Sequence, residues 1–422
     1  MERYSEYKDS GVKWLGEVPS HWNCIRLKNV FSKRTTGSWG EEENHSQKNA
    51  ECLRIADFDY NKLRFQKKEE YTIRSYASKE VENKKLVKGD LLIEKSGGGD
   101  KTPVGRCVVF DLDIHDAMYA NFMEKLSPRN DIDSFYICYL LSCFYSYGMV
   151  WPYVKATTGI QNLDITSLLS KEYVYIPPRA EQDAIVRYLD AATSKIDKAI
   201  AMQQKMIDLL NERKQIIIQN AVTKGLDENV EMKDSGVEWI GMIPKHWKII
   251  RIKHLAKLQS GSNLTSNEIS DTGSYPVYGG NGLRGFYGSY NCEGSYVLIG
   301  RQGALCGNIN YAEDKFWATE HAVVCYPKKK YNTLWFGEVL RLMDLGQYSL
   351  ASAQPGLAVE RIKGLYMPYP SIEEQNKIAL FLKQNIGKID LYARHCQRQI
   401  TLLQERKQII INEVVTGKVK VS

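Results

Sequence analysis

Two groups of residues have spacings close to those of catalytic or nucleotide-binding motifs, but neither has the context that its chemistry needs. Gly280–Gly285 fits the G-x-G-x-x-G pattern of a dinucleotide site, yet Phe286–Tyr290 has no helical periodicity to supply the phosphate-binding helix. Asp90, Glu94 and Lys95 are nuclease-like residue types, but Lys95 directly follows Glu94 and no third carboxylate has a metal-binding spacing. The N-P-P-Y or D-P-P-Y tetrapeptide of amino-methyltransferases and the helicase motifs are also missing. The sequence therefore predicts no catalytic residues.

Two glycine-containing loops after predicted strands are suited to binding nucleic acid. Lys95 precedes Ser96–Lys101, whose backbone N–H groups could cradle a phosphate, and Arg301 holds a similar place in Gly300–Gly303. Arginine can bond guanine, and glutamine adenine, through paired hydrogen bonds. Either loop could instead be a solvated turn.

Further polar segments occupy corresponding places in the two halves of the chain. Lys33–Ser38 and Gln259–Asn263 offer basic and hydroxyl groups near a turn, and Thr157–Leu163 corresponds in position to Ser352–Leu357. A loop around Tyr278 completes the set, although plain turns remain an alternative for each segment. The candidate DNA contacts are Lys33, Arg34, Thr35, Lys95, Ser96, Lys101, Thr157, Thr158, Gln161, Ser262, Asn263, Tyr278, Asn281, Arg284, Arg301 and Gln302.

The composition is that of a globular protein. Hydrophobic residues make up 43% and charged residues 25% of 422, which excludes a wholly disordered or fibrous chain. The net charge of +7 permits nucleic acid as a partner without requiring it. We expect no secretory signal, no membrane span and no metal site, because the nine cysteines contain no C-x-x-C and the seven histidines no zinc spacing. Free thiols in a reducing cytoplasm are the expectation.

The strongest feature of the sequence is an internal repeat. The segment from Lys8 to Lys28 recurs from Lys233 to Lys253, 225 residues later, with its tryptophans, glycines, proline and histidine in place. A second segment, beginning at Glu181 and containing the run ERKQIII, recurs from Glu374, 193 residues later. Between the paired segments lie two inserts that differ in length by about 32 residues. The paired repeated segments therefore form one frame that occurs twice in the chain, each time with a different insert.

The second repeated segment predicts two long helices with a coiled-coil seam, because its apolar residues recur at steps of three, four or seven. The seam residues are Ile185, Leu189, Ala192, Ile196, Ala199, Met206, Leu210 and Ile217, and in the second copy Ile378, Leu382, Ile389, Tyr392, Leu403 and Ile410. Gln203 and Cys396 interrupt it. Ser371 and Glu374 form a capping box, and Gly225 and Gly417 lie where the helices should stop. Each helix should run about 60–68 Å.

Connectivity then predicts the arrangement. The first helix leads from the first insert to the second module, so an equivalent second helix must end near the start of the first module. We expect the helices to run antiparallel about a pseudo-two-fold axis, with the termini close together; two separate modules with helical tails are the alternative. The inserts read as α/β, with strands at 88–93, 106–110, 294–299 and 320–324 and helices at 134–147 and 333–345.

This order of blocks resembles the specificity subunit of type I restriction–modification enzymes. The resemblance lies in three blocks in a fixed order: S-G-V-x-W-[LI]-G-x-x-P-x-H-W, a variable α/β segment, and E-Q followed by L-L-x-E-R-K-Q-I-I-I. This order occurs twice and covers nearly the whole chain. It implies two α/β (α+β) target-recognition domains joined and separated by two long antiparallel conserved helices. The implied boundaries are 1–178, 179–224, 225–370 and 371–422.

The resemblance also implies a function. Each recognition domain would read one half of an asymmetric bipartite site in double-stranded DNA. The helices would space the two domains and dock two modification (methyltransferase) subunits, which restriction (motor–nuclease) subunits then join. Catalysis, with its S-adenosylmethionine, ATP and magnesium, would belong to those partners. The spacer or docking residues are Trp22, Trp247, Ile196, Leu210, Arg213, Ile389, Leu403 and Arg406.

Two alternatives remain. A catalytic nucleic-acid enzyme would transfer methyl groups alone, but its motifs are missing. A scaffold without a DNA role would show no salt-dependent duplex binding in its complex.

Overall fold

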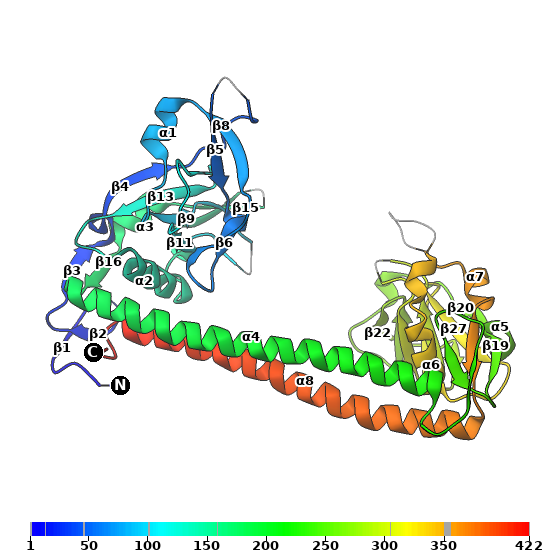
Figure 1. The fold of residues 1–422 in the computed structure, drawn as a ribbon. Helices are drawn as coiled ribbons and strands as arrows, with labels where there is room; N and C mark the ends of the chain where they lie inside the picture. Colours follow the sequence, from blue (N-terminus) through cyan, green and yellow to red (C-terminus); the bar gives the residue numbers. More distant parts are fainter. Residues whose placement is uncertain are drawn as a thin grey trace. The chain divides into compact units, whose positions relative to one another are not determined.

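The structure is a computed structural model that describes residues 2–12, 14–44, 47–99, 102–157, 159–303, 305–349 and 356–421. It divides into two compact units, Met1–Gln203 with Arg398–Ser422 (unit 1) and Gln204–Gln397 (unit 2). Each unit contains one insert with strands and helices and parts of two long helices (Figure 1). The division falls within both long helices, so each helix belongs partly to each unit.

The insert of unit 1 is built on a sheet in the order β4-β13-β9-β11-β7-β6, with helix α2 packed against β11. Its strands are β4 (Phe31–Thr36), β13 (Met123–Pro128), β9 (Leu91–Glu94), β11 (Cys107–Val109), β7 (Arg64–Phe65) and β6 (Phe58–Asp59). Smaller sheets combine β12 (Met118–Tyr119), β5 (Lys48–Leu53) and β8 (Thr72–Tyr76), and β10 (Ser96–Gly97), β15 (Ile160–Leu163) and β14 (Val154–Thr157). The helices are α1 (Ser78–Lys84), α2 (Ser134–Ser146) and α3 (Ile165–Lys171).

The insert of unit 2 repeats the first part of this topology in the order β20-β27-β24-β25. These strands are β20 (Ala256–Ser260), β27 (Ala322–Pro327), β24 (Tyr296–Gly300) and β25 (Ile309–Ala312), and α6 (Thr333–Leu342) packs on them. The other sheet holds β22 (Gly282–Tyr287), β21 (Tyr275–Gly279), β26 (Lys315–Ala318) and β23 (Cys292–Glu293), and two short helices are α5 (Ile252–Leu255) and α7 (Val359–Lys363). The four predicted strands and two predicted helices of the inserts are confirmed, with ends that differ by a few residues.

Short antiparallel pairs attach each insert to the repeated frame. They are β1 (Tyr7–Asp9) with β2 (Glu17–Pro19) and β3 (Asn23–Arg26) with β16 (Tyr173–Ile176) in unit 1. Unit 2 has β17 (Met232–Asp234) with β18 (Met242–Pro244) and β19 (Lys248–Arg251) with β28 (Tyr366–Tyr369). The strand that opens each insert thus pairs with the strand that closes it.

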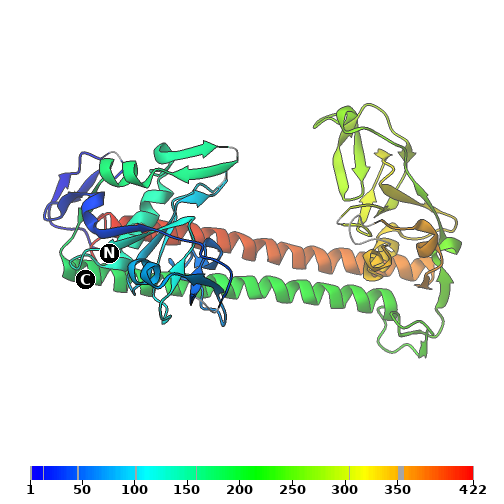
Figure 2. The same cartoon turned by 90° about the horizontal axis from the view of Figure 1, so that it is seen from above.

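The two predicted long helices are α4 (Arg179–Lys224) and α8 (Ile372–Val415), and they run antiparallel within each unit (Figure 2). In unit 1, Ile185 and Leu189 share a core with Ile411 of α8. In unit 2, Ile218 of α4 shares a core with Ile378. The same ion pair recurs between the helices, as Lys407 Nζ to Asp197 Oδ1 at 2.7 Å in unit 1 and Lys214 Nζ to Asp390 Oδ1 at 2.8 Å in unit 2.

The prediction of the coiled-coil seam is wrong in the middle of the two helices. Met206 is 49% exposed and Tyr392 is 61% exposed. The half-buried stripe passes instead through Gln203 and Ile207 on α4, and through Ala393 and Cys396 on α8. The buried ends of the helices fix which face turns inward, so the stripe continues at steps of three and four residues whatever the polarity of the side chain there.

A half-buried carboxylate at the first turn of each long helix bonds the repeated tryptophan and histidine. In unit 2, Glu374 accepts from Trp247 Nε1 at 3.0 Å and lies 2.7 Å from His246 Nε2, and it closes the predicted capping box with Ser371. In unit 1, Glu181 accepts from Trp22 Nε1 at 3.0 Å and lies 2.8 Å from His21 Nε2.

Unit 1 has Pro178 at the position of Ser371, so the capping hydroxyl is missing there. The hydroxyl of Tyr4 donates to Glu181 instead, and its ring packs on Trp22. A residue from the N-terminal segment therefore supplies the hydroxyl that donates to the carboxylate, although it does not cap the helix N–H groups. Trp22 and Trp247 are 1% exposed, so the structure places both in the cores and leaves no surface for direct contact with a partner.

The glutamine next to each of these glutamates connects the helix to the insert. Gln182 accepts from Asp133 N at 2.7 Å and donates to Pro177 O at 2.9 Å. Gln375 accepts from Asn332 N and donates to Pro370 O, both at 3.0 Å. Asp133 and Asn332 are the N-caps of α2 and α6, so the amide fixes where the insert helix starts.

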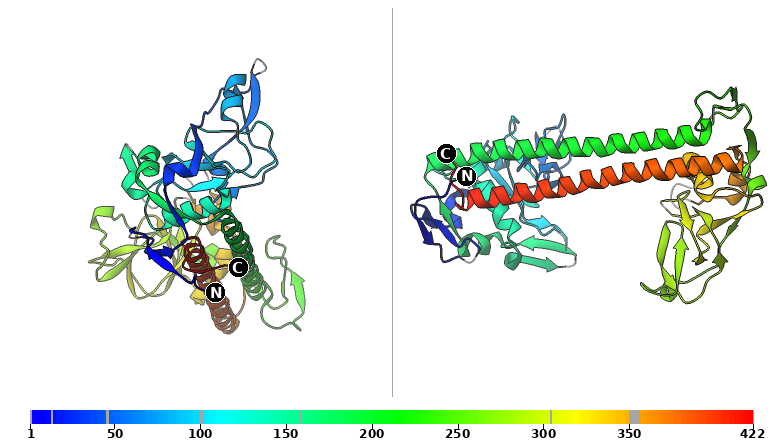
Figure 3. Two further views of the ribbon diagram at one scale, coloured as in Figure 1. Left: turned by 90° about the vertical axis from the view of Figure 1, so that its left-hand side faces the viewer. Right: turned by 90° about the horizontal axis from the view of Figure 1, so that it is seen from below.

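The second long helix ends at the first module, as connectivity predicts. Gly417 has a φ of 73°, and a Cβ there would lie 2.4 Å from Pro19 and 3.1 Å from Trp22. Lys418 Nζ donates to Leu15 O at 2.6 Å. Glu2 and Lys420 form a β-bridge, so the two ends of the chain meet in unit 1 (Figure 3).

Of the described residues, no helix is both long and apolar enough to cross a membrane, and no cluster of three His, Cys, Asp or Glu side chains could hold a metal ion. All nine cysteines lie in described segments and are free thiols.

The substitution Glu374→Gln should reduce stability in a pH-dependent way. Burial favours a raised pKa for the Glu374 carboxyl, but hydrogen bonds from Trp247, His246 and Ser371 outweigh it and lower the pKa to about 2. The stabilisation is present above the unfolded-state pKa near 4.3 and is lost as pH falls towards 2. We expect a loss of about 1–2 kcal/mol in unfolding free energy at pH 7, allowing for partial solvent screening, and almost none at pH 2.5.

Urea unfolding of both proteins at several pH values measures this difference. Glu360→Gln is the matched control, because that carboxylate is 83% exposed. A difference between Glu374→Gln and wild type that stays constant from pH 7 to pH 2.5 would contradict the assignment.

Candidate nucleic-acid interface

In unit 1, two segments predicted to bind DNA lie side by side beyond the end of β9. Lys95 O accepts from Leu163 N at 2.8 Å, and β10 pairs with β15 so that Ser96 faces Asn162 and Gly97 faces Gln161. The residues after the strand and the segment before the long helix thus form one surface, 66 residues apart along the chain at the Ser96–Asn162 contact.

Unit 2 has the same arrangement beyond the end of β24. Arg301 O accepts from Leu357 N at 2.8 Å, and Gln302 forms a bridge with Gly356. On the other side, Arg301 N donates to His321 O, as Lys95 N does to Phe122 O, both at 2.8 Å. Lys95 and Arg301, which the sequence suggests are equivalent, therefore make equivalent backbone hydrogen bonds in the two units.

Both cations lie against a hydroxyl, at the end of β4 in unit 1 and of β20 in unit 2. Lys95 Nζ lies 3.4 Å from Thr36 Oγ1, and Arg301 Nη1 lies 3.2 Å from Ser260 Oγ. Within the described ranges, no carboxylate is within ion-pair distance of either cation. Both charges remain available to an anionic ligand.

A glycine with no room for a side chain follows each of these hydroxyl residues. Gly37 N donates to Met123 O at 3.1 Å, and Gly261 N donates to Ala322 O at 3.0 Å. A Cβ on Gly37 would lie 2.1 Å from Ala120 O, and one on Gly261 would lie 2.1 Å from Ala318 O. The close approach of the two backbones fixes the position of the hydroxyl.

In Gly280–Gly285 the first two residues form the turn between β21 and β22 and the rest belong to β22, so a strand follows the glycines and not the helix of a dinucleotide site. The turn packs against the interface, because a Cβ on Gly300 would lie 2.1 Å from Gly280 O. Asn281 is exposed and accepts from Asn308 Nδ2 at 3.1 Å. Tyr278 instead packs edge-on against Phe316, and burial raises the pKa of its hydroxyl. Arg284 is exposed and bonds Ser266 Oγ.

Lys33–Thr36 belong to strand β4, not to the expected loop, because they pair with β13. The Arg34 side chain is bonded to other side chains of the protein: it forms an ion pair with Glu124 at 2.5 Å and a hydrogen bond with Thr166. Lys33 Nζ donates to Asn83 O at 3.0 Å, and Thr35 O accepts from Tyr119 at 3.0 Å. Ser262 and Asn263 follow β20 and are exposed.

Ser96 and Gln161 are buried and shape the unit 1 loop from within. Ser96 Oγ donates to Asn162 Oδ1 at 2.6 Å. Gln161 accepts from Val104 N and donates to Gly99 O, both at 3.2 Å. Lys101, Thr158 and Ser352–Pro355 lie outside the described residues, as does the side chain of Thr157.

The carboxylate next to Lys95 is part of the protein core. Glu94 is 3% exposed, and it bonds Arg106 at 2.8 Å and Tyr60 at 2.5 Å. Burial, the bond to Glu94 and its negative charge raise the pKa of Tyr60 well above its ordinary value. This carboxylate therefore neutralises Arg106.

The long helices also carry exposed apolar side chains that the sequence analysis missed. Ile196 and Ile389 are buried and Leu210 and Leu403 half-buried on the predicted seam, whereas Arg213 and Arg406 are exposed. On either side of each arginine lies an exposed apolar residue: Leu209 at 49% and Ile216 at 50% on α4, Leu402 at 46% and Ile409 at 55% on α8. Their recurrence at equivalent positions in both copies was a usable signal.

Comparisons with known proteins agree with this architecture. A family model described as the type I restriction modification DNA specificity domain matches residues 19–206 and 244–402. The chain is 37% identical over 161 residues to the EcoprrI type I restriction enzyme specificity subunit of Escherichia coli, an alignment covering 36% of this chain and 40% of that protein. It is 22% identical to the putative MjaX specificity subunit of Methanocaldococcus jannaschii over 98% of both chains.

Two solved structures share the fold. A chain from a study of complex assembly and conformational transition of the type I R-M system has a TM-score of 0.72 at 12% identity, over 95% of this chain and 99% of that chain. The HsdS subunit from Thermoanaerobacter tengcongensis has a TM-score of 0.52 at 13% identity, over 95% and 98%.

The substitution Gly261→Ala should destabilise unit 2, because the added methyl group must displace the backbone of Ala318. We expect a loss of about 1–3 kcal/mol in unfolding free energy, the usual cost of overpacking. Gly288→Ala is the control, because nothing lies within 4 Å of a Cβ there. Denaturant unfolding measures both variants, and equal stability of the two would contradict the tight approach.

Proposed function

The chain belongs to the type I restriction–modification DNA specificity family, and we propose that it is the subunit that recognises the DNA sequence for such a system. The observation that carries this proposal is one interface built twice with different side chains. Each unit has a cation without a carboxylate partner among the described residues at the same place in the same backbone frame, Lys95 in one and Arg301 in the other. Two surfaces of common origin and different chemistry suit two different DNA targets.

The DNA site would be bipartite and asymmetric. Each unit would contact one half-site in double-stranded DNA, and a gap of several base pairs between them would go unread. The modest charge of +7 fits a subunit that shares the duplex with its partners and does not hold it alone.

The chain would position other subunits and catalyse nothing itself. Two modification (methyltransferase) subunits would supply methyl transfer with S-adenosylmethionine, and restriction (motor–nuclease) subunits would use ATP and magnesium. The nuclease-like carboxylate next to Lys95, Glu94, is buried and bonded to Arg106 and Tyr60, which supports this division.

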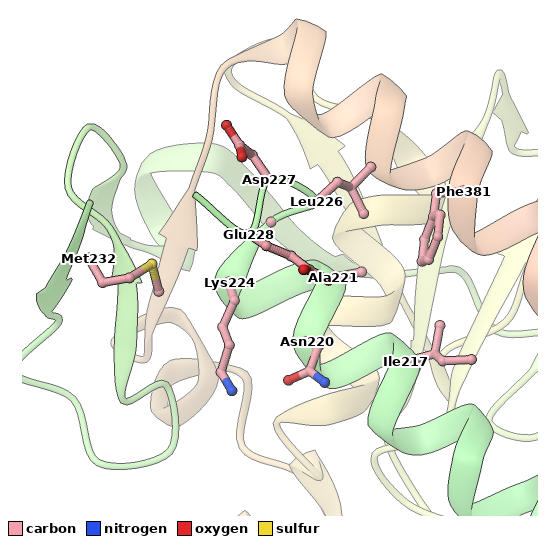
Figure 4. Close-up of a pocket in the computed structure, with 10 residues that line it drawn as sticks. Ile217, Asn220, Ala221, Lys224, Leu226, Asp227, Glu228, Met232 and Phe381 are labelled. Carbon is pink, nitrogen blue, oxygen red and sulfur yellow. The ribbon is translucent and has the colours of Figure 1, made fainter. Parts of the chain in front are cut away.

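The proposed docking surface for the modification subunits is the apolar stripe on each long helix, Leu209, Arg213 and Ile216 on α4 and Leu402, Arg406 and Ile409 on α8. Exposed leucine and isoleucine around an arginine are typical of a helix that receives another helix. In unit 2, Ile217, Leu226 and Phe381 line a surface cavity of about 620 Å³ at the end of α4 (Figure 4). Such a cavity could receive an apolar side chain of the partner.

DNA methylation in cells tests the function. The chain is co-expressed with the modification subunit of its own system, and methylated bases are mapped across the genome. We expect one motif with two unlike halves and a fixed gap. A continuous or palindromic motif would refute the bipartite model. Methylation by the purified chain alone would assign catalysis to it, and the absence of salt-dependent duplex binding by the complex would argue against a DNA role.

The double substitution Leu209→Asp with Leu402→Asp should weaken assembly. A charge at each exposed leucine must be desolvated on docking, so we expect the affinity for the modification subunit to fall at least tenfold, with helical content unchanged. Calorimetric titration and circular dichroism measure the two quantities. Gln215→Asp, at an exposed position of α4 outside the stripe, is the control. Unchanged affinity in the double variant would place the docking surface elsewhere.

A further inference from the structure

We propose that each half-site is specified through one matched pair of facing residues, Lys95 with Phe122 in unit 1 and Arg301 with His321 in unit 2. This inference rests on the proposed DNA function and identifies the positions within each unit that decide the sequence read. The argument uses strand register, surface exposure, charge and hydrogen-bonding chemistry.

Strand register makes the two pairs equivalent. In unit 1, β13 pairs with β9 so that Met123 faces Glu94, and the next pair outward is Phe122 with Lys95. In unit 2, β27 pairs with β24 so that Ala322 faces Gly300, and the next pair is His321 with Arg301. Both pairs lie one residue beyond the paired strands, where Phe122 and His321 belong to turns, and each is held by one backbone hydrogen bond, from Lys95 N to Phe122 O or from Arg301 N to His321 O.

The third strand keeps the same register. Thr36 of β4 faces Glu124, and Ser260 of β20 faces Val323, in each case two residues beyond Phe122 or His321. The hydroxyl that touches the cation is therefore also at one shared position. The backbone frame is the same in both units, and the residues displayed on it differ at the cation and its facing neighbour.

Phe122 and Arg301 are exposed and Lys95 and His321 are half-buried, whereas their neighbours in the sheet are fully buried. Phe122 is 51% exposed, and Met123 beside it is fully buried. The His321 side chain is 38% exposed and lies 3.1 Å from Glu320, while Ala322 is buried. An exposed phenylalanine suits apolar contact with a thymine methyl group, and a histidine offers a hydrogen bond instead.

The charges of Lys95 and Arg301 are better placed for DNA than that of Arg34. The Arg34 guanidinium is paired with Glu124, so binding to DNA would first require that ion pair to break. Among the residues that the structure describes, the side chains of Lys95 and Arg301 each bond one neutral hydroxyl and no carboxylate, so their charges are not neutralised there.

The two cations differ in what they can discriminate. The guanidinium of Arg301 presents a planar fork that matches O6 and N7 of guanine, whereas the ammonium of Lys95 is a single point charge. Unit 2 should therefore require a G·C pair at the position that Arg301 reads. Unit 1 should be more tolerant at the corresponding position.

The experiment compares methylation motifs set by the full chain assembled with its modification subunit. The variants are Arg301→Ala, Arg301→Lys and Lys95→Ala, with Arg361→Ala and Lys79→Ala as controls at exposed basic residues on α7 and α1. We expect Arg301→Ala to relax one G·C position of one half-site by about 10- to 100-fold and to leave the other half-site unchanged. Lys95→Ala should alter only the other half-site, and the controls should alter neither.

The outcomes distinguish failure of this inference from failure of the proposed DNA-recognition function. If the wild-type complex gives no bipartite motif, the proposed function fails. If wild type gives the motif but Arg301→Ala weakens methylation at all sites equally, Arg301 contacts only phosphate and the inference is overturned. Arg301→Lys keeps the charge, so it should lose the guanine preference while retaining duplex affinity. If Arg301→Lys kept the guanine preference, the inference would also be overturned. This variant therefore still tests the inference if Arg301→Ala does not fold.

Discussion

Each unit depends on two adjacent side chains in the first turn of its long helix, a glutamate and a glutamine. The glutamate accepts hydrogen bonds from the tryptophan and the histidine that open the module, and the glutamine bonds the N-cap residue of the helix that packs on the insert sheet. Frame, insert and long helix therefore meet at one point. Both glutamines and both tryptophans are almost fully buried, where an unsatisfied polar group would cost about 1–3 kcal/mol.

This junction explains how the inserts could diverge while the units stayed alike. An insert must begin with a strand that pairs with the strand closing it, and it must present a helix N-cap to the glutamine. Between those fixed points its length and side chains are free to vary. The residues that follow β9 and β24 lie in that free part, which is why the basic residue there can be lysine in one unit and arginine in the other.

The local substitutions at the junction follow the same requirement. Ser371 completes a capping box with Glu374, but Pro178 cannot do so for Glu181, and the hydroxyl of Tyr4 takes its place. The carboxylate keeps its donors although they come from different parts of the chain. Gly37 and Gly261 are likewise required at equivalent positions in the two units, since a side chain at either position would collide with a carbonyl oxygen.

The sequence by itself determined the duplicated frame, the two long helices with their glycine stops and the meeting of the chain ends, because these follow from repeats, periodicity and connectivity. It also indicated Lys95 and Arg301 as related positions. The tertiary structure alone decided which candidate cations are free, since only it shows Arg34 paired with Glu124. It moved Met206 and Tyr392 off the helix seam, and it placed Phe122 and His321 beside the cations. Register between strands and burial depend on contacts across many residues of chain, and local periodicity in divergent inserts does not contain them.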